Sequence, residues 1–317
     1  MNKYLLSLLS MLMVCFNASA TEEGALNGTF TVNGSGDKVQ FSQGNLQYQA
    51  STCTWRFAEN QWDMIGDDNS NISASYTGWI DLFCWGTGNN PTNASTNISD
   101  YSTFTDWGVN AISNGGNQAN QWRTLTKAEW GYLFQNRADA GNKYGAAKVN
   151  GITGVVLLPD NWTLPSDCGF TAGMTSASSW SDWSLVASTN IYDAVHWSEM
   201  EKAGAVFLPA AGSRDGTEVG YVGLSGRYWS ATVYNTNYAY MLYYYSNRIS
   251  PKGFDGDRDG GKSVRLVRTH IPDANPTAIE NTLAGQTQPA TQKILRDGQI
   301  YILRGEKVYT LTGQEVK

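Results

Sequence analysis

Histidine is nearly absent from this sequence: only His196 and His270 occur among its 317 residues. Catalytic triads and many zinc sites depend on the imidazole ring, which exchanges protons near neutral pH and ligates metals through its nitrogens. A histidine-centred triad or a histidine-rich metal site is therefore hard to build from this chain. We interpret His196 as a residue of helix packing, and we assign no catalytic residue.

Long hydrophobic runs are missing except at the amino terminus. Lys3 precedes a mainly apolar stretch at residues 4–16, and Ala18-Ser19-Ala20 supplies the small residues that signal peptidases read. The stretch is too short to span a bilayer core of roughly 30 Å, so we predict a signal peptide over residues 1–20. No later segment reaches the roughly 18 apolar residues of a membrane helix. We therefore expect a secreted or cell-surface protein with no transmembrane span.

Cysteine is also scarce. Cleavage after Ala20 leaves Cys53, Cys84 and Cys168. An odd number excludes complete pairing within one chain, so one disulfide with one thiol, or no disulfide at all, are both open. The spacings fit no zinc motif.

Positive charge is in short supply as well. The chain has 22 Lys and Arg against 28 Asp and Glu, which gives a formal net charge of −6. Nothing in this balance attracts a phosphate backbone, so we do not expect nucleic acid as a partner. Neither a P-loop nor a strand-bounded G-x-G-x-x-G occurs, and we expect no nucleotide cofactor. Aromatic rings are plentiful, with 12 Trp and 17 Tyr, and such rings suit both cores and surfaces that bind sugars or proteins.

The pattern along the chain predicts an α+β fold of mainly short antiparallel strands and long loops with two helices. Strands are expected within residues 28–48, and scattered tryptophans anchor a loop-rich stretch at residues 55–120. Continuous apolar runs at residues 154–159 and 204–209 indicate two buried strands. An aromatic β region and a closing strand follow at residues 227–234, 238–247 and 263–268.

Both expected helices have clear end signals. Thr126 and Glu129 have the spacing of a capping box that precedes an apolar face. Apolar spacing predicts the second helix over residues 191–203, with Gly204 at its end.

The carboxyl-terminal part of the chain divides in two. Residues 271–292 lack hydrophobic periodicity, which is typical of a linker. Residues 293–317 regain an alternating pattern around a turn at Arg304-Gly305-Glu306, which predicts a β-hairpin. The expected plan is a signal peptide at residues 1–20, one binding domain including the N-terminal strands at 21–270, a linker at 271–292 and a hairpin at 293–317.

Five motif-bearing segments occur in a fixed order, at residues 122–130, 157–162, 205–212, 228–232 and 263–267. This ordered set resembles a family of exported Bacteroidetes and Fibrobacter proteins with a C-type-lectin-like fold, distantly related to formylglycine-generating-enzyme-type domains. The resemblance implies a scaffold that displays ligand-binding loops. The distant oxidase relatives use a reactive cysteine pair, and no two of the three remaining cysteines match that pattern.

The tail at residues 297–316 resembles the C-terminal sorting domains of Bacteroidetes type IX secretion, although it is shorter than most. This resemblance implies passage across the outer membrane, with the secretion machinery as a partner. Whether such a tail would be cleaved or anchored on the surface stays open.

An aromatic and amide-rich stretch before the closing strand is the predicted ligand site. Because side chains alternate along a strand, the even-numbered residues of 240–245 share one face and the odd-numbered ones the other, so one row must be exposed or covered by a partner. Flat rings next to amide and hydroxyl groups suit sugars and protein surfaces alike. The predicted ligand-binding residues are Tyr234, Asn235, Asn237, Tyr238, Tyr243, Tyr245 and Asn247.

Three aspartates near the closing strand have the spacing that opens calcium loops. Asp255, Asp257 and Asp259 precede Gly260 in a D-x-D-x-D-G pattern. The twelfth position is Leu266 rather than glutamate, so the segment is not an EF-hand. We treat the three aspartates as candidate calcium ligands, with a polar turn as the alternative.

These features favour a non-enzymatic protein that binds a glycan or protein ligand at the cell surface or outside the cell. One alternative is a structural subunit or adhesin, in which the same surface packs against other chains. The other is a carbohydrate-active or oxidative enzyme. Paired carboxylates could hydrolyse glycosides, but the sequence does not select a pair among its many acids.

Overall fold

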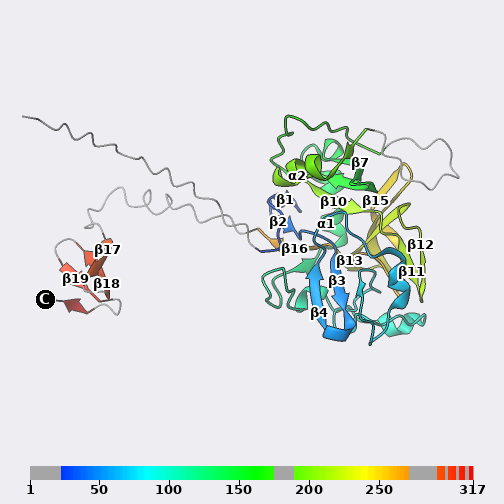
Figure 1. Cartoon of the computed structure of the whole chain (residues 1–317), viewed down its shortest axis with the longest axis horizontal. Helices are drawn as coiled ribbons and strands as arrows, with labels where there is room; N and C mark the ends of the chain where they lie inside the picture. Colours follow the sequence, from blue (N-terminus) through cyan, green and yellow to red (C-terminus); the bar gives the residue numbers. More distant parts are fainter. Residues whose placement is uncertain are drawn as a thin grey trace, which may run out of the picture. The chain divides into compact units, whose positions relative to one another are not determined.

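The computed structural model describes residues 23–174, 189–270, 291–296, 299–304, 307–310 and 314–316. It divides into two compact units, residues 1–270 and 271–317, which we describe separately. The predicted signal peptide at residues 1–20 and most of the predicted linker, residues 271–290, lie outside the described residues. Figure 1 shows the described elements as coloured ribbons.

Small antiparallel sheets make up most of the first unit, and its described part contains two α-helices. This mixture of helix and sheet, with strands in excess, confirms the α+β class. In the described part of the chain, no helix combines the length and the apolar character that crossing a membrane would take.

One sheet joins the two ends of the first unit. Phe41 lies opposite Val267, and Phe30 meets Phe41 edge to face with ring centroids 5.0 Å apart. Both rings are fully buried, so apolar burial holds this pairing together. The strands follow the order β1 (Phe30–Thr31), β2 (Lys38–Phe41), β16 (Leu266–Thr269) and β6 (Arg123–Thr124).

The closing strand starts later than predicted. β16 begins at Leu266, whereas the sequence suggested residue 263. Ser263 instead forms an isolated parallel bridge with Tyr228, and its backbone N–H donates to the carbonyl of Arg227 at 3.0 Å. The first residue of the predicted strand therefore pairs with the neighbouring aromatic sheet.

The two apolar runs predicted as buried strands lie side by side. Val206 pairs with Leu157 across an antiparallel ladder, and every residue of β10 is buried. A Cβ atom added at Gly154 would collide with the Leu208 carbonyl and the Phe207 ring, so this close approach requires glycine. The sheet has the order β10 (Val206–Pro209), β8 (Ile152–Leu157), β7 (Tyr144–Val149) and β9 (Ile191–Tyr192).

The capping box of the first helix is confirmed. The Thr126 hydroxyl accepts from the Glu129 N–H at 3.3 Å, and the Glu129 carboxylate accepts from the Thr126 N–H at 2.7 Å. Helix α1 (Lys127–Gly131) then continues as a π-helical turn, Tyr132–Asn136.

The second helix starts three residues later than predicted. The stretch Ile191–Tyr192 forms β9, which pairs in parallel with β7. Asp193 then caps α2 (Ala194–Lys202) by accepting the His196 N–H at 2.8 Å. Gly204, at a φ of 95°, follows the end of the helix as the sequence indicated.

The long stretch predicted as loops is held by its tryptophans. Of the five tryptophans in this stretch, Trp55, Trp85 and Trp107 are buried and pack in one cluster with Trp229 and Met241, which confirms them as anchors. Trp62 and Trp79 are half-buried. The short elements here are β3 (Leu46–Gln49), β4 (Thr54–Phe57), β5 (Trp79–Ile80) and 3-10 helices at Ala50–Thr52, Gly66–Asn71, Ile98–Tyr101, Trp107–Val109 and, further on, Ala140–Asn142.

The aromatic region forms a three-stranded antiparallel sheet of β13 (Ser225–Val233), β14 (Tyr238–Tyr245) and β15 (Arg248–Asp257). Neither predicted row of β14 is exposed as a whole. Leu242 and Tyr244 are buried on one side and Met241 on the other, whereas Tyr243 and Tyr245 are half-buried. Register shifts near Ala239 and Met241, together with the tryptophan cluster, explain why burial does not follow simple alternation. A separate ribbon pairs β11 (Ser213–Asp215) with β12 (Glu218–Gly220).

The second unit is larger than a hairpin. Strands β18 (Gln299–Arg304) and β19 (Lys307–Tyr309) pair antiparallel where the sequence predicts a hairpin. They belong, however, to a four-stranded sheet that also contains β17 (Thr291–Arg296) and β20 (Glu315–Val316). Strand β17 starts within the last residues assigned to the linker. The extra strands help because a lone hairpin is marginally stable in water.

Candidate functional site

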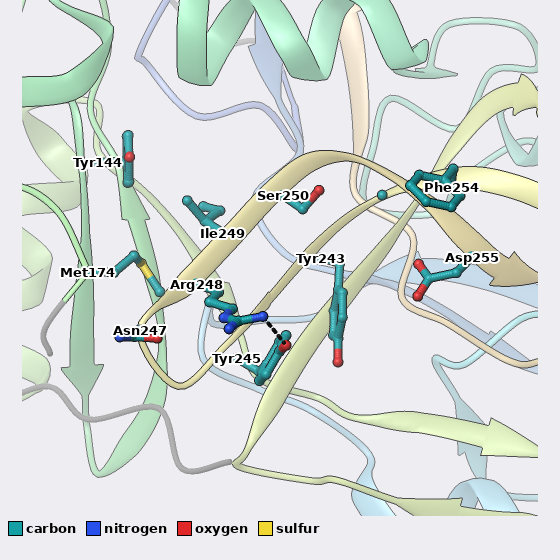
Figure 2. A pocket seen from close by; sticks show the side chains of 11 residues that line it. Tyr144, Met174, Tyr243, Tyr245, Asn247, Arg248, Ile249, Ser250, Phe254 and Asp255 are labelled. Atoms are coloured by element: carbon teal, nitrogen blue, oxygen red, sulfur yellow. Dashed lines mark hydrogen bonds between the residues drawn. The ribbon is translucent and has the colours of Figure 1, made fainter. Parts of the chain in front are cut away.

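A cavity of about 620 Å³ opens beside the hairpin of β14 and β15. Its volume falls within the roughly 300–1,000 Å³ of small-ligand sites. Figure 2 shows the side chains around it. The lining consists of Tyr144, Met174, Tyr243, Tyr245, Asn247, Arg248, Ile249, Ser250, Gly253, Phe254 and Asp255.

The tight turn of this hairpin fixes the position of the rim. Tyr245 pairs with Arg248, which leaves Ser246 and Asn247 as a two-residue connection. Ser246 adopts a φ of 48°, in the left-handed region that such short turns use. Asn247 is consequently held at the exposed tip of the hairpin, with its amide at the cavity edge.

Two tyrosine rings form a stacked wall. Tyr243 and Tyr245 lie on the same face of β14, with ring centroids 4.9 Å apart and an interplanar angle of 25°. Arg248 is the cross-strand partner of Tyr245 and donates from its guanidinium to the phenol oxygen at 3.4 Å, the contact drawn in Figure 2. The two rings therefore present a held aromatic surface rather than freely rotating side chains.

A cation supports this wall from the other side. Arg227 lies opposite Tyr243 on β13, and its guanidinium carbon is 5.0 Å from the centres of both the Tyr243 and Tyr221 rings. Burial raises the pKa of Tyr243, and the positive charge of Arg227 opposes that shift. Tyr221, Arg227, Tyr243 and Tyr245 thus make one column, in which the cation is attracted to both adjacent ring faces.

The opposite wall rests on the core. Tyr144 comes from β7 and Met174 from the loop that follows β8, so both lie more than 60 residues before the hairpin in sequence. Together with Ile249, they pack half-buried against the core cluster that contains Leu157 and Tyr244. This packing fixes the wall, and no local pattern in the sequence indicated that Tyr144 or Met174 would reach the site.

The structure separates the predicted ligand residues into two groups. Tyr243, Tyr245 and Asn247 line the cavity. The other four lie at the turn between β13 and β14, at the far end of a strand roughly 25 Å long. One of them has a structural task, because the side-chain oxygen of Asn235 accepts the N–H groups of Asn237 and Tyr238 at 2.8 and 2.9 Å.

Phe254, which sequence reasoning missed, connects the two groups. Its ring is 58% exposed, lines the cavity, and lies 5.5 Å from the ring of Tyr234. Tyr234 in turn meets Tyr240 at 5.2 Å, and the ammonium of Lys127 lies 3.8 Å from the centre of the Tyr240 ring. An exposed aromatic surface therefore runs from the cavity to the β13–β14 turn.

The three candidate calcium ligands are divided between two cavities. Asp255 lines the cavity just described, whereas Asp257 and Asp259 line a second one beside Lys262. The Lys262 ammonium donates to the Asp257 carbonyl oxygen at 2.9 Å. Within the described ranges, no three His, Cys, Asp or Glu side chains gather where they could hold a metal ion. Calcium binding at these aspartates stays a prediction.

The remaining candidate reactive groups lie away from the cavity lining. Cys53, Cys84 and Cys168 are all free thiols, which settles the pairing left open by the sequence. His196 was expected to pack inside a helix interface, but its side chain is 50% exposed and lies 2.8 Å from the Asp193 carboxylate. It belongs to the exposed first turn of α2, where the neighbouring cap leaves it in solvent.

The chemistry of the cavity is that of recognition by stacking and hydrogen bonding. The tyrosine rings offer apolar faces, and the amide of Asn247, the hydroxyl of Ser250 and the charged ends of Arg248 and Asp255 offer donors and acceptors. A ligand with flat apolar faces and many hydroxyl groups matches this set. Sugars have that combination.

No family model, no curated protein and no solved structure matches this chain.

Proposed function

We propose that residues 21–270 form a non-enzymatic ligand-binding domain with a C-type-lectin-like fold. In this proposal the protein is secreted or displayed on the cell surface, the carboxyl-terminal unit acts as a sorting tail, and the ligand is a glycan held in the cavity beside β14 and β15. The observation that carries the proposal is the stacked Tyr243–Tyr245 wall, supported by Arg227 and Arg248.

Preorganisation favours recognition at this wall. A ring that is already held loses little conformational freedom when a sugar stacks on it, so more of the contact energy appears as affinity. The cavity is open enough to accept one or two sugar rings of a longer chain, and Asn247 and Ser250 can bond hydroxyl groups at its edge.

Binding fits the cavity better than turnover. Among the residues that the structure describes, its charged lining consists of Arg248 and one carboxylate, Asp255. Glycoside hydrolysis commonly uses two carboxyl groups, roughly 5–10 Å apart, on either side of the scissile bond. The single carboxylate can accept hydrogen bonds from sugar hydroxyls without a second acid.

A protein ligand, or a role as an adhesin or structural subunit, is the second candidate, and one observation favours it. Tyr234 and Phe254 are 47% and 58% exposed and form an aromatic patch next to the cavity. Neighbouring exposed aromatic side chains are common where proteins bind one another.

A glycan and protein array separates these candidates. We expect the full chain to bind glycans, and Tyr243→Ala with Tyr245→Ala to weaken binding by roughly ten- to a hundredfold, because each ring contributes about 0.7–1.4 kcal/mol. The matched control, Tyr234→Ala with Tyr238→Ala, removes two tyrosines outside the cavity and leaves glycan affinity within about twofold.

Other outcomes point elsewhere. Unchanged glycan binding in the cavity variant would remove the proposed site. Loss of protein binding in the control variant alone would move the ligand surface to the β13–β14 turn, and a stable homopolymer by size-exclusion chromatography would favour the structural role. Product release from the array glycans would favour an enzyme. Repeating the array with EDTA tests whether calcium contributes.

A further inference from the structure

A second cavity lies at the other end of the aromatic column. Its volume is about 300 Å³. Four segments meet there: β11, the loop between β12 and β13, the start of β13, and the stretch from the end of β15 towards β16. The lining residues are Ser213, Arg214, Asp215, Tyr221, Arg227, Asp257, Asp259, Gly260 and Lys262.

Arg214 places a buried positive charge in this cavity. Arg214 is only 1% exposed. The two terminal nitrogens are used, since one donates to the Gly216 carbonyl and the other to the Leu82 carbonyl and the Cys84 sulfur. The Nε of Arg214 is buried and has no hydrogen-bond acceptor among the described residues. Buried donors of this kind are normally satisfied.

Lys262 adds a second buried cation. It is 3% exposed, and its ammonium lies 4.3 Å from the centre of the Trp229 ring. Burial lowers the pKa of Lys262 to about 8, with the positive charge of Arg227 as the next cause, although Asp257 partly compensates. Arg214 and Lys262 are therefore two buried cations in the lining of one cavity.

Arg227 links this cavity to the first. It lines the second cavity, stacks on the Tyr243 ring that lines the first, and has a buried Nε that lacks an acceptor in the described part of the chain. Other buried guanidinium nitrogens without acceptors, such as those of Arg258 and Arg265, belong to residues that line neither cavity. Two unsatisfied guanidinium donors thus border one cavity.

The rim carries the opposite charge. Asp215 and Asp257 are exposed, and Asp259 is half-buried. Carboxylates at a rim accept hydrogen bonds from hydroxyl groups, whereas they repel a doubly charged phosphate. The buried cations suit a ligand with a single carboxylate. The rim aspartates suit the hydroxyl groups of the same ligand.

We propose that this cavity is a second subsite, which takes the carboxylate of an acidic sugar residue while a neighbouring sugar of the same chain packs against the wall of Tyr243 and Tyr245. The planar carboxylate matches the geometry of a guanidinium edge, and Arg214, Arg227 and Lys262 supply the donors. This subsite rests on the proposed glycan-binding function and extends it to acidic glycans as the ligand class.

The experiment compares an oligogalacturonate with the same oligosaccharide after its carboxyl groups are reduced to alcohols. By titration calorimetry, the full chain should bind the acidic form about tenfold more tightly, which is the effect of one good charge-assisted contact. Lys262→Met should lower that preference to about twofold or less. Lys148→Met, on β7 and outside both cavities, is the matched control and should keep the preference.

The outcomes separate the subsite from the proposed function. Equal binding of the two oligosaccharides by the unmodified chain overturns the subsite and leaves the Tyr243–Tyr245 site standing. Tyr243→Ala with Tyr245→Ala should weaken both forms alike, and an unchanged neutral affinity in that variant would contradict the proposed function instead.

A direct measurement on the unmodified chain covers the case in which Lys262→Met does not fold or neither oligosaccharide binds. Free galacturonate should shift the indole N–H resonance of Trp229, whose ring lies under Lys262. No shift at saturating galacturonate overturns the subsite. A shift produced by glycine but not by galacturonate would also overturn it, because the rim aspartates would then be pairing with an ammonium group.

Discussion

Tyr244 and Tyr245 are neighbours on β14, yet their side chains lie in different surroundings. Tyr244 is fully buried, donates its hydroxyl to the Leu208 carbonyl at 2.5 Å, and stacks on Tyr228 with ring centroids 6.4 Å apart. Tyr245 is half-buried, contacts Tyr243, and lines the open cavity. One strand thus contributes the same residue type to the core from one face and to the candidate ligand site from the other, because alternate side chains point to opposite sides.

The largest expected effect tests whether side chains on the two faces of β14 contribute differently to the free energy of unfolding. Tyr244→Ala should lower the free energy of unfolding by about 4 kcal/mol, because it leaves a large cavity in the core. Tyr245→Ala should cost less than about 1 kcal/mol, as expected for a side chain at a solvent-exposed cavity. Urea unfolding followed by tryptophan fluorescence measures both. Equal losses in the two variants would break the distinction between a core face and a ligand face.

The next prediction concerns a carboxyl group on the core side. Asp81 is fully buried, accepts hydrogen bonds from the Ile65 N–H at 3.0 Å and the Asn69 amide at 2.8 Å, and acts electrostatically on Tyr228. Burial raises the pKa of Asp81 from 3.8 to about 6, against the opposing effect of these hydrogen bonds. Between about pH 4 and pH 6 the folded chain therefore keeps a proton that the unfolded chain has lost.

Stability should consequently fall as the pH rises through that window. A shift of about two pKa units corresponds to roughly 3 kcal/mol, most of it lost by pH 7. Urea unfolding at pH 4, 5, 6 and 7 measures the slope in the native chain and in Asp81→Asn, which cannot ionise. Asp255→Asn, on the exposed cavity side, is the matched control and should keep the native slope. Parallel curves for Asp81→Asn and the native chain would mean that the pKa of Asp81 is the same in the folded and unfolded chain, which contradicts the prediction.

The sequence indicated that the tyrosines of β14 alternate, but it could not indicate which face is the core. That choice depends on Leu208 and Gly226, which come from other strands: the first accepts the Tyr244 hydroxyl, and the second leaves room for its ring, which would collide with any Cβ at that position. Local signals were sufficient where the physics is local. The Thr126–Glu129 capping box is the clearest case, since both hydrogen bonds join residues three apart.

The candidate site shows even more clearly that local sequence patterns do not reveal contacts made by distant segments. Tyr243, Tyr245 and Asn247 could be selected because rings and amides are dense in that stretch. Met174 and Tyr221 could not, since they reach the site through loops whose course is set by the packing of distant sheets. The predicted start of α2 was wrong for a related reason. Ile191 has the spacing of a helical residue, but Ile191 and Tyr192 pair with β7 instead. Tertiary pairing overrode local periodicity there.

The smallest predicted effect asks whether the cavity face is a held surface or only a row of side chains. In a double-mutant cycle on Tyr243→Ala and Tyr245→Ala, the coupling free energy should be about 0.5–1 kcal/mol in favour of the pair, because the two rings stack and share the support of Arg227 and Arg248. Urea unfolding gives the free energy of unfolding of the native chain, the two single variants and the double variant. A coupling energy near zero would mean that the rings move independently in solution. In that case a sugar would have to order them on binding, and the argument from preorganisation would no longer explain glycan affinity at this cavity.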